Sequence, residues 1–173
     1  MPRLPKRRIS LSDIIEELPH NSSFWWDKER AEYLLRQMSP RHRAVADEMI
    51  AGREVRFGTV FRRVRKGRSM AELRTDGVAG CLRTPRGGSG RQILFAAGRG
   101  RFAVRLLTPR ECARLMGAGE FKIEAPVNQA LFGFGDAVTV PVIAWIARNY
   151  LTPAWEEARA GREEAARLGR VDR

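Results

Sequence analysis

The spacing of the apolar residues changes near Val55, and this change constrains the fold more than any other feature of the sequence. Before it, Ala31, Leu34 and Leu35 recur at the three- and four-residue spacing of an amphipathic helix. After it, apolar and polar residues alternate over residues 55–62, which is typical of a half-buried strand whose odd-numbered residues face inward. A chain that joins helical and alternating segments in this way is predicted to be an α+β domain.

Capping residues set the expected limits of the first helices. Asp27 precedes the apolar series above, and Ser39 precedes a proline, so both are typical N-caps of a helical hairpin that ends at Gly52. Ser10 predicts a short helix before this hairpin, and we expect that helix to end at Pro19. The aromatic residues 24–26 lie between the short helix and the hairpin. We interpret them as core anchors of the hairpin rather than as base-stacking residues.

Two further elements are predicted after the first strand. Ile93 and Phe95 are placed to pair with Phe102 and Val104 across a Gly-Arg-Gly turn, which indicates a β-hairpin. The sequence that follows, residues 108–117, carries the clearest local signal in the chain.

A capping box opens this segment. Thr108 and Glu111 have the spacing at which a hydroxyl and a carboxylate satisfy backbone donors reciprocally, and Pro109 occupies the first helical position. We expect the helix to end at Gly117. Farther on, a strongly apolar and buried helix is expected up to Leu151.

The positive charge is concentrated in one part of the chain. The net charge is +12, and residues 51–110 hold 15 basic and 3 acidic residues, whereas the remainder is nearly balanced. Such a density of positive charge attracts a polyanion, most often nucleic acid. Because 28 of the 32 basic residues are arginine, codon bias is the alternative. Codon bias would not remove acidic residues from a single window, so we favour nucleic-acid binding.

Several classes of protein are excluded by composition. Cys81 and Cys112 lack the CxxC spacing, and His20 and His42 stand alone, so neither a disulfide framework nor a metal site is expected. We therefore expect a cytoplasmic protein. No apolar run approaches the roughly 20 residues of a membrane helix, so no membrane span is expected. The 43% of hydrophobic residues allows a packed core.

A glycine-rich segment runs from Thr84 to Gln92 between the predicted strands. Its glycines would let a backbone approach a ligand closely, and Arg83, Arg86 and Arg91 surround it with positive charge. It matches neither the Walker loop nor the dinucleotide fingerprint. A surface loop without a ligand is the alternative interpretation.

The order of these segments resembles a known family. Arg105 to Gly117 (RLLTPRECARLMG) and Phe134 to Val142 (FGDAVTVPV) resemble motifs IX and X, the last two sequence blocks of DNA cytosine-5 methyltransferases. Asp76 to Thr84 and the glycine-rich segment look like the target recognition domain of that family. The resemblance covers about residues 75–148, and residues 10–50 resemble the family only loosely.

The resemblance implies a fold and a division of the chain. The implied fold is α+β, with an irregular, strand-rich target recognition lobe flanked by the N-terminal helical hairpin. C-terminal helices would complete an S-adenosylmethionine-dependent methyltransferase domain. The implied parts are a basic tail (1–9), a target recognition region that binds double-stranded DNA (10–106), the motif IX and X segment (107–151) and an exposed helical tail (152–173).

The resemblance also implies residue roles. Five residues would mainly contact phosphate: Arg62, Arg63, Arg65, Lys66 and Arg68. Eight are candidates for base edges and phosphates: Arg83, Thr84, Arg86, Gly87, Gly88, Ser89, Arg91 and Gln92. Arg105, Thr108 and Glu111 would be architectural. Asp136, Ala137 and Val138 would line the edge of the S-adenosylmethionine pocket, with Asp136 in place of the family's usual asparagine.

No catalytic residue is expected in this sequence. The family's chemistry needs a cysteine thiolate in a Pro-Cys-Gln context, a glutamate in Glu-Asn-Val and a Phe-x-Gly-x-Gly turn for the cofactor, and none of these occurs. The chain is therefore expected to be inactive without a complementary methyltransferase chain. Three origins stay open: a subunit of a split enzyme, a fragment, or a remnant. A non-enzymatic nucleic-acid-binding protein is the alternative function.

Overall fold

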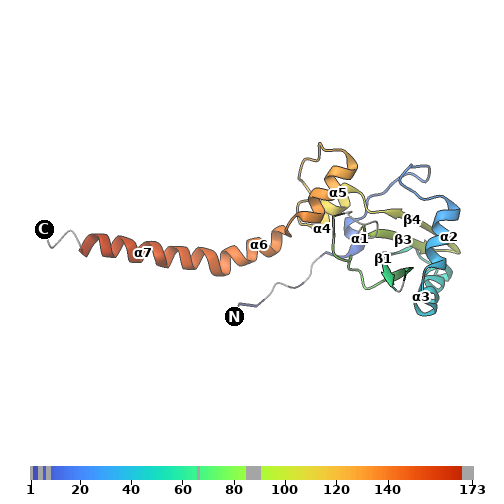
Figure 1. Cartoon of the computed structure of the whole chain (residues 1–173), viewed down its shortest axis with the longest axis horizontal. Helices are drawn as coiled ribbons and strands as arrows, with labels where there is room; N and C mark the ends of the chain where they lie inside the picture. Colours follow the sequence, from blue (N-terminus) through green and yellow to red (C-terminus); the bar gives the residue numbers. More distant parts are fainter. Residues whose placement is uncertain (1, 4–5, 7–8, 66, 85–90, 169–173) are drawn as a thin grey trace. The chain divides into compact units, whose positions relative to one another are not determined.

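The computed structural model describes residues 2–3, 6, 9–65, 67–84 and 91–168 (Figure 1). The chain divides into two compact units. The larger unit spans Arg7–Ala137, and the smaller one consists of Met1–Lys6 with Val138–Arg173. The architecture of the larger unit is a mixed α+β fold, which confirms the expected class.

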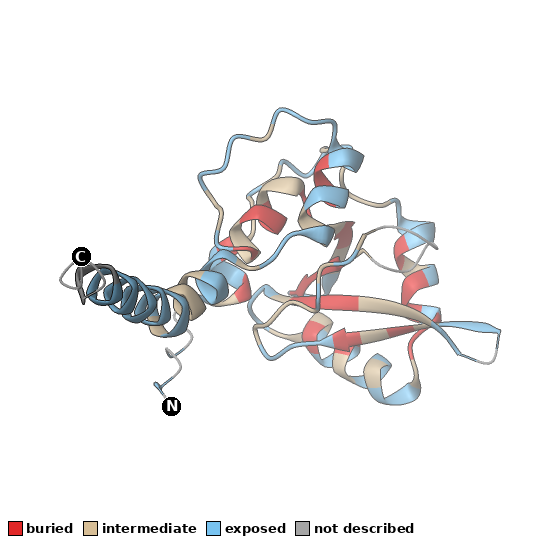
Figure 2. Ribbon diagram, turned by 60° about the vertical axis from the view of Figure 1, so that its left-hand side comes forward, coloured by how far each residue is buried: buried red, intermediate tan, exposed pale blue. Residues whose placement is uncertain are grey.

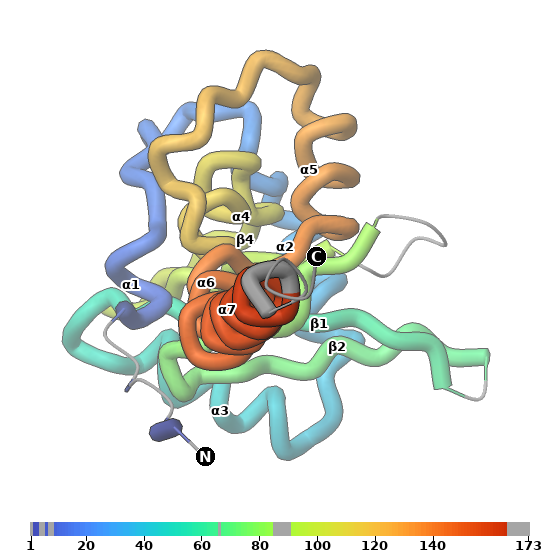
Figure 3. The backbone as a smooth tube through the Cα atoms, turned by 90° about the vertical axis from the view of Figure 1, so that its left-hand side faces the viewer, coloured from blue at the N-terminus to red at the C-terminus, as the bar shows by residue number. Residues whose placement is uncertain are grey.

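The larger unit contains a four-stranded antiparallel sheet with helices on both faces. The strand order is β2-β1-β3-β4. Its elements in chain order are α1 (Leu11–Ile14), α2 (Lys28–Arg36), α3 (Pro40–Ala51), β1 (Arg56–Arg65), β2 (Arg68–Arg74), β3 (Ile93–Gly98), β4 (Arg101–Leu106), α4 (Pro109–Leu115) and α5 (Val127–Asp136). Figure 3 shows α4 and α5 on one side of the strands and α3 on the other.

The main core lies between the sheet and the helices α2 and α3. Leu34 and Met49 of these helices pack with Val60 and Phe95 of the central strands, and all four are almost completely buried. A second core on the opposite face joins Leu94 of β3 to α4 and α5. Because both faces are covered, β3 is buried along its whole length.

The predicted hairpin is confirmed. Phe95 pairs with Val104, and the rings of Phe95 and Phe102 lie 5.8 Å apart. The turn consists of Arg99 and Gly100, whose φ angles are 56° and 75°. Two successive positive φ values define the type I′ turn that suits the twist of a tight hairpin.

The predicted helix limits are also largely confirmed. The side chains of Asp27 and Ser39 accept hydrogen bonds from backbone N–H groups at the starts of α2 and α3. The capping box of Thr108 and Glu111 opens α4, and Gly117 follows its C-cap with a φ of 72°. The helix that begins after Ser10 spans only Leu11–Ile14 and is therefore shorter than expected.

Three expectations about the remaining elements are corrected. Val60 was expected on the polar side of β1, but it is completely buried, because helices cover both faces of the sheet. The strand Arg68–Arg74 was not predicted. No helix was predicted between Gly117 and the apolar helix that ends near Leu151, but the structure has the helix Val127–Asp136 there.

The smaller unit is helical. It contains α6 (Val140–Ile146), the π-helical turn η1 (Ala147–Leu151) and α7 (Thr152–Leu168). The apolar helix up to Leu151 was expected to be buried, but Ile143 and Leu151 are 45% and 61% exposed. Every residue of α7 with a described side chain is exposed (Figure 2).

The helical stretch Val127–Ala165 contains an 18-residue window with a mean hydropathy of 1.7, of which 11% is buried. By length and composition alone, this stretch is long and apolar enough to cross a membrane. The stretch is not one continuous helix, because Ala137 and Thr139 have extended backbone conformations between α5 and α6.

Candidate nucleic-acid interface

The end of the β1–β2 hairpin gathers four of the five arginine and lysine residues that were predicted to contact phosphate. Arg62, Arg63 and Arg65 lie near the end of β1, and Arg68 opens β2 directly opposite Arg65. Lys66 lies outside the described residues. We call these four arginines the arginine cluster. The antiparallel pairing of two short strands therefore concentrates positive charge at one end of the sheet.

One carboxylate lies within the arginine cluster. Glu72 of β2 accepts a hydrogen bond of 2.6 Å from Nη2 of Arg63, and its other oxygen lies 3.9 Å from Nη2 of Arg65. The side chain of Glu72 is 29% exposed, so solvent screens this pair only in part. Within the described part of the chain, Arg62 and Arg68 form no ion pair. Glu72 thus partly neutralises one side of the cluster.

Two guanidinium groups share one aromatic ring beside the cluster. The Cζ atoms of Arg63 and Arg83 lie 5.1 and 5.7 Å from the centroid of the Phe61 ring. Arg83 is exposed and has no carboxylate partner among the residues that the structure describes. Attraction to the ring face orients such a cation without neutralising it. Arg83 therefore presents its full charge next to the hairpin.

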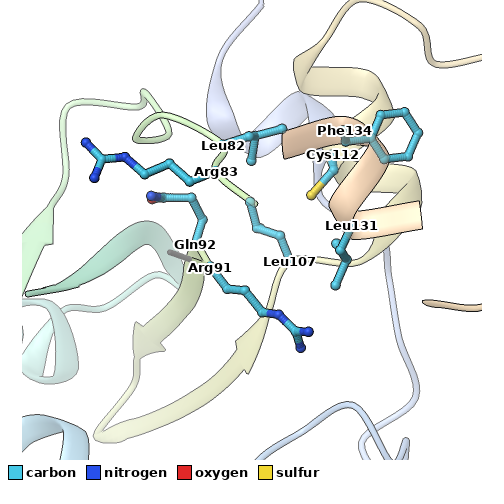
Figure 4. A pocket seen from close by; sticks show the side chains of 8 residues that line it. All are labelled: Leu82, Arg83, Arg91, Gln92, Leu107, Cys112, Leu131 and Phe134. Carbon is cyan, nitrogen blue, oxygen red and sulfur yellow. The ribbon is translucent and has the colours of Figure 1, made fainter. Parts of the chain in front are cut away.

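Arg91 lies two residues before β3, and Arg83 lies in the segment that precedes residues 85–90. Nη2 of Arg91 donates a hydrogen bond of 2.8 Å to Oδ1 of Asn128 on α5. The guanidinium groups of Arg83 and Arg91 point in different directions (Figure 4). Four of the predicted base-contacting residues lie outside the described residues: Arg86, Gly87, Gly88 and Ser89.

Gln92 has a structural position, although it was predicted as a DNA contact. Its side chain is 4% exposed, and Nε2 donates a hydrogen bond of 3.2 Å to the carbonyl of Cys81. The amide therefore fastens the segment before residue 85 to β3. A space of about 20 Å³ remains between this segment and the helices α4 and α5. It has room for one water molecule and is far too small for a nucleobase.

A buried ion pair connects β4 to α4. The side chains of Arg105 and Glu111 are completely buried, and their two hydrogen bonds measure 2.5 and 2.7 Å. Oε2 of Glu111 also accepts a hydrogen bond of 2.8 Å from the backbone N–H of Thr108. A buried ion pair is favourable only when further hydrogen bonds satisfy its remaining groups. The guanidinium also donates to the carbonyls of Leu106 and Glu16, while Nε of Arg105 has no hydrogen-bond partner among the described residues. This geometry gives Arg105, Thr108 and Glu111 a structural position.

Sequence reasoning missed the fourth member of this group. Glu16 lies just after α1, its backbone N–H donates to Glu111, and its carboxylate accepts a hydrogen bond from the hydroxyl of Thr108. No local pattern marks Glu16, because the contact joins residues far apart in the sequence. We call Arg105, Thr108, Glu111 and Glu16 the buried node. Trp25 lies beside it, with its ring 5.1 Å from the guanidinium of Arg105, and packs against the second core rather than against the predicted hairpin.

Cys112 lacks the properties of a nucleophile, and neither cysteine belongs to a metal-binding group within the described residues. Burial, together with the charge of Glu111, raises the pKa of the Cys112 thiol from 9.0 to about 12. A thiol with this pKa carries almost no thiolate at neutral pH. Cys81 is exposed. Among the described residues, no group of three or more His, Cys, Asp or Glu side chains is arranged to hold a metal ion.

The three residues predicted at the edge of a cofactor pocket lie where the larger unit ends and the second segment of the smaller unit begins. Asp136 is the last residue of α5, and Ala137 is its C-cap. Val138 begins the second segment of the smaller unit. All three are exposed.

Comparison with known proteins gives a family match over most of the chain. The family model described as C-5 cytosine-specific DNA methylase matches residues 4–152. A DNA-cytosine methyltransferase of Escherichia coli strain K12 is 49% identical over 74 residues, which are 40% of this chain and 16% of that protein. The corresponding protein of Escherichia coli O157:H7 matches equally well. The match thus spans about a sixth of these relatives, and no solved structure matches the chain significantly.

Proposed function

The chain belongs to the C-5 cytosine-specific DNA methylase family, and from this premise we propose that it is the DNA-recognising, C-terminal portion of a DNA (cytosine-5-)-methyltransferase. In this role it binds double-stranded DNA and completes the S-adenosylmethionine pocket. The observation that carries the proposal is the arginine cluster beside Arg83, at one end of a sheet that the buried node ties to α4.

The arginine cluster supplies the affinity in this proposal. Arg62 and Arg68 carry charges that no ion pair within the described part of the chain offsets. Arg65 lies 3.9 Å from the carboxylate of Glu72, which it shares with Arg63. Guanidinium groups of this kind bind phosphate oxygens and release counterions from the duplex. Contacts of this type set the position of the protein on DNA without reading its sequence.

Arg83 and Arg91 supply the sequence choice. An arginine can donate two parallel hydrogen bonds to the O6 and N7 atoms of guanine, which separates guanine from the other bases. Arg83 is exposed, and its head group is oriented by the Phe61 ring. Arg91 uses Nη2 for Asn128 and keeps further N–H groups for a ligand.

The methyl transfer itself requires groups from elsewhere. The family uses S-adenosylmethionine, which would supply the methyl group. Asp136 is exposed at the end of α5, and its carboxylate can accept hydrogen bonds from hydroxyl or ammonium groups, which fits the edge of such a site. The sequence holds no Pro-Cys-Gln cysteine, and Cys112 is protonated at neutral pH. We therefore propose that a complementary methyltransferase chain or segment provides the nucleophile and the rest of the pocket.

A transfer assay tests this proposal. Duplex DNA and labelled S-adenosylmethionine are incubated with this chain, with a family segment that carries the Phe-x-Gly-x-Gly, Pro-Cys-Gln and Glu-Asn-Val motifs, and with both together. We expect methyl transfer only from the mixture, and none when the Pro-Cys-Gln cysteine is replaced by alanine. Activity of this chain alone would overturn the proposal. DNA binding without transfer in any combination would instead indicate a non-enzymatic DNA-binding protein.

A further inference from the structure

The helix α5 holds both Arg83 and Arg91 at once. At its last turn, Gly135 lies against the backbone of Arg83 and Thr84. At its first turn, Asn128 accepts the hydrogen bond from Arg91. Two arginines from different segments of the sheet region are therefore fixed to the two ends of one helix.

The contact at Gly135 depends on the absence of a side chain. A Cβ atom at this position would lie 2.4 Å from the backbone N of Thr84 and 2.5 Å from the carbonyl carbon of Arg83. Both distances are far below van der Waals contact, and the atoms belong to the backbone, so the segment would have to move. Gly133, one half-turn earlier on the same helix, has open space around the corresponding position.

The contact at Asn128 orients the other arginine. Its Oδ1 atom accepts a hydrogen bond of 2.8 Å from one terminal nitrogen of Arg91, which restrains the position of the guanidinium group. The remaining N–H groups of that arginine stay available to a ligand.

The helix itself is held in the core of the larger unit. Ala130 and Leu131 are each 8% exposed, and Leu131 belongs to the same core cluster as Leu107 and Cys112. Phe134 packs against this cluster as well. A helix that is packed in this way moves as part of the core, so it can transmit a fixed geometry to the residues attached to it.

We propose that α5 is the positioning element for sequence recognition, with Gly135 and Asn128 as positioning residues that set the separation and orientation of Arg83 and Arg91. This inference rests on the proposed function, because it assigns the way in which that DNA-binding site chooses its sequence. Neither Gly135 nor Asn128 contacts DNA in this proposal. A specific contact tolerates only small displacements of its donors, whereas a phosphate contact tolerates larger ones.

The test measures sequence choice and general affinity separately. The purified chain is incubated with a randomised duplex library, and the bound DNA is sequenced. Affinity for a duplex of unrelated sequence and the thermal midpoint of unfolding are measured in parallel. Gly135→Ala is compared with Gly133→Ala, and Asn128→Leu with Asn128→Asp, which keeps an acceptor oxygen for Arg91.

We expect Gly135→Ala and Asn128→Leu to lose most of the discrimination at one base position, which is about 5- to 150-fold for one arginine–guanine pair. Gly133→Ala and Asn128→Asp should keep the wild-type sequence preference. General affinity should change by less than about twofold in all four variants, because the arginine cluster is untouched.

The other outcomes overturn either the inference about α5 alone or the proposed function as well. If Gly135→Ala does not fold, the pair of Asn128 variants decides, and equal preferences in that pair overturn the inference. A wild-type preference in both Gly135→Ala and Asn128→Leu also overturns it, while the proposed function stands. Wild-type protein that binds DNA with no sequence preference overturns the inference as well. Wild-type protein that does not bind DNA overturns the proposed function and the inference together.

Discussion

Arg105 and Glu111 form the most consequential pair at the scale of single residues. Both side chains are completely buried, and each is the charge partner of the other. Removing one partner leaves a buried charge without compensation, which typically costs about 3–5 kcal/mol. We therefore predict that Glu111→Gln lowers the free energy of unfolding by this amount in urea titrations. Asp47→Asn removes the exposed ion pair with Arg43 and should cost less than about 1 kcal/mol. Equal effects of the two substitutions would contradict a structural role of the buried node.

Glu72 limits the charge that the arginine cluster offers to DNA. Its carboxylate must release Arg63 before that arginine can contact a phosphate at full strength. We predict that Glu72→Gln strengthens DNA binding and makes the slope of log K against log salt steeper by about one. Glu48→Gln makes the same change of net charge beside Arg56, which lies at the other end of β1. If both substitutions strengthen binding equally, the effect is one of net charge and not of the cluster.

Cys112 gives a pH-dependent contribution to stability. Burial raises the pKa of its thiol from 9.0 to about 12, so the folded protein holds this proton more tightly than the unfolded chain does. The contribution is complete below pH 9 and is lost as the pH rises towards 12. We predict that wild-type protein loses more stability than Cys112→Ala between pH 8 and pH 10, measured by urea titration at each pH.

At pH 8 a thiol reagent should modify Cys81 alone until the protein unfolds. Rapid modification of both cysteines in the folded protein would contradict this account.

At the scale of elements, the local signals of the sequence were reliable and the long-range ones were not. The hairpin at Arg99 and the capping box at Thr108 depend on residues a few positions apart, and both were predicted. The strand Arg68–Arg74 was missed, because its position follows from pairing with β1 rather than from its own apolar pattern. The helix α5 was missed because its glycines interrupt the apolar spacing, although Leu131 anchors it in the core.

In the candidate site, too, the features set by nearby residues could be predicted from the sequence, whereas those set by distant segments could not. The arginine cluster followed from charge counting, since charged residues on one hairpin stay together in space. The positions of Glu16 and Gln92 could not be predicted, because one contacts α4 across 95 residues and the other is buried by a segment 11 residues away. Burial by distant segments decides whether a polar side chain faces a ligand or the interior.

The apolar helices of the smaller unit carry a prediction at this scale. Val142, Ile143, Leu151 and Trp155 are between 45% and 61% exposed. Large apolar side chains that are exposed in this way favour association with a partner surface. We predict that the purified chain self-associates in sedimentation experiments and binds a hydrophobic dye, and that Ile143→Lys with Leu151→Glu abolishes both. A wild-type monomer without dye binding would contradict the prediction.

At the scale of the whole molecule, each part of the larger unit serves the placement of the arginines in our account. The sheet joins the arginine cluster to β3, the buried node ties β4 to α4, and α5 holds Arg83 and Arg91. The central claim is that this assembly recognises duplex DNA through the charges at the end of the β1–β2 hairpin. In our proposal, catalysis depends on a complementary chain or segment, but DNA binding does not.

The measurement that tests this claim most directly is the salt dependence of DNA binding by the purified chain. With about 5 phosphate contacts, log K should fall against log salt with a slope of roughly −4 to −5. Replacing Arg62, Arg63 and Arg65 together by alanine should flatten this slope to about −2 and weaken binding to all sequences alike. An affinity that does not depend on salt, or a slope that the triple substitution leaves unchanged, would contradict the claim.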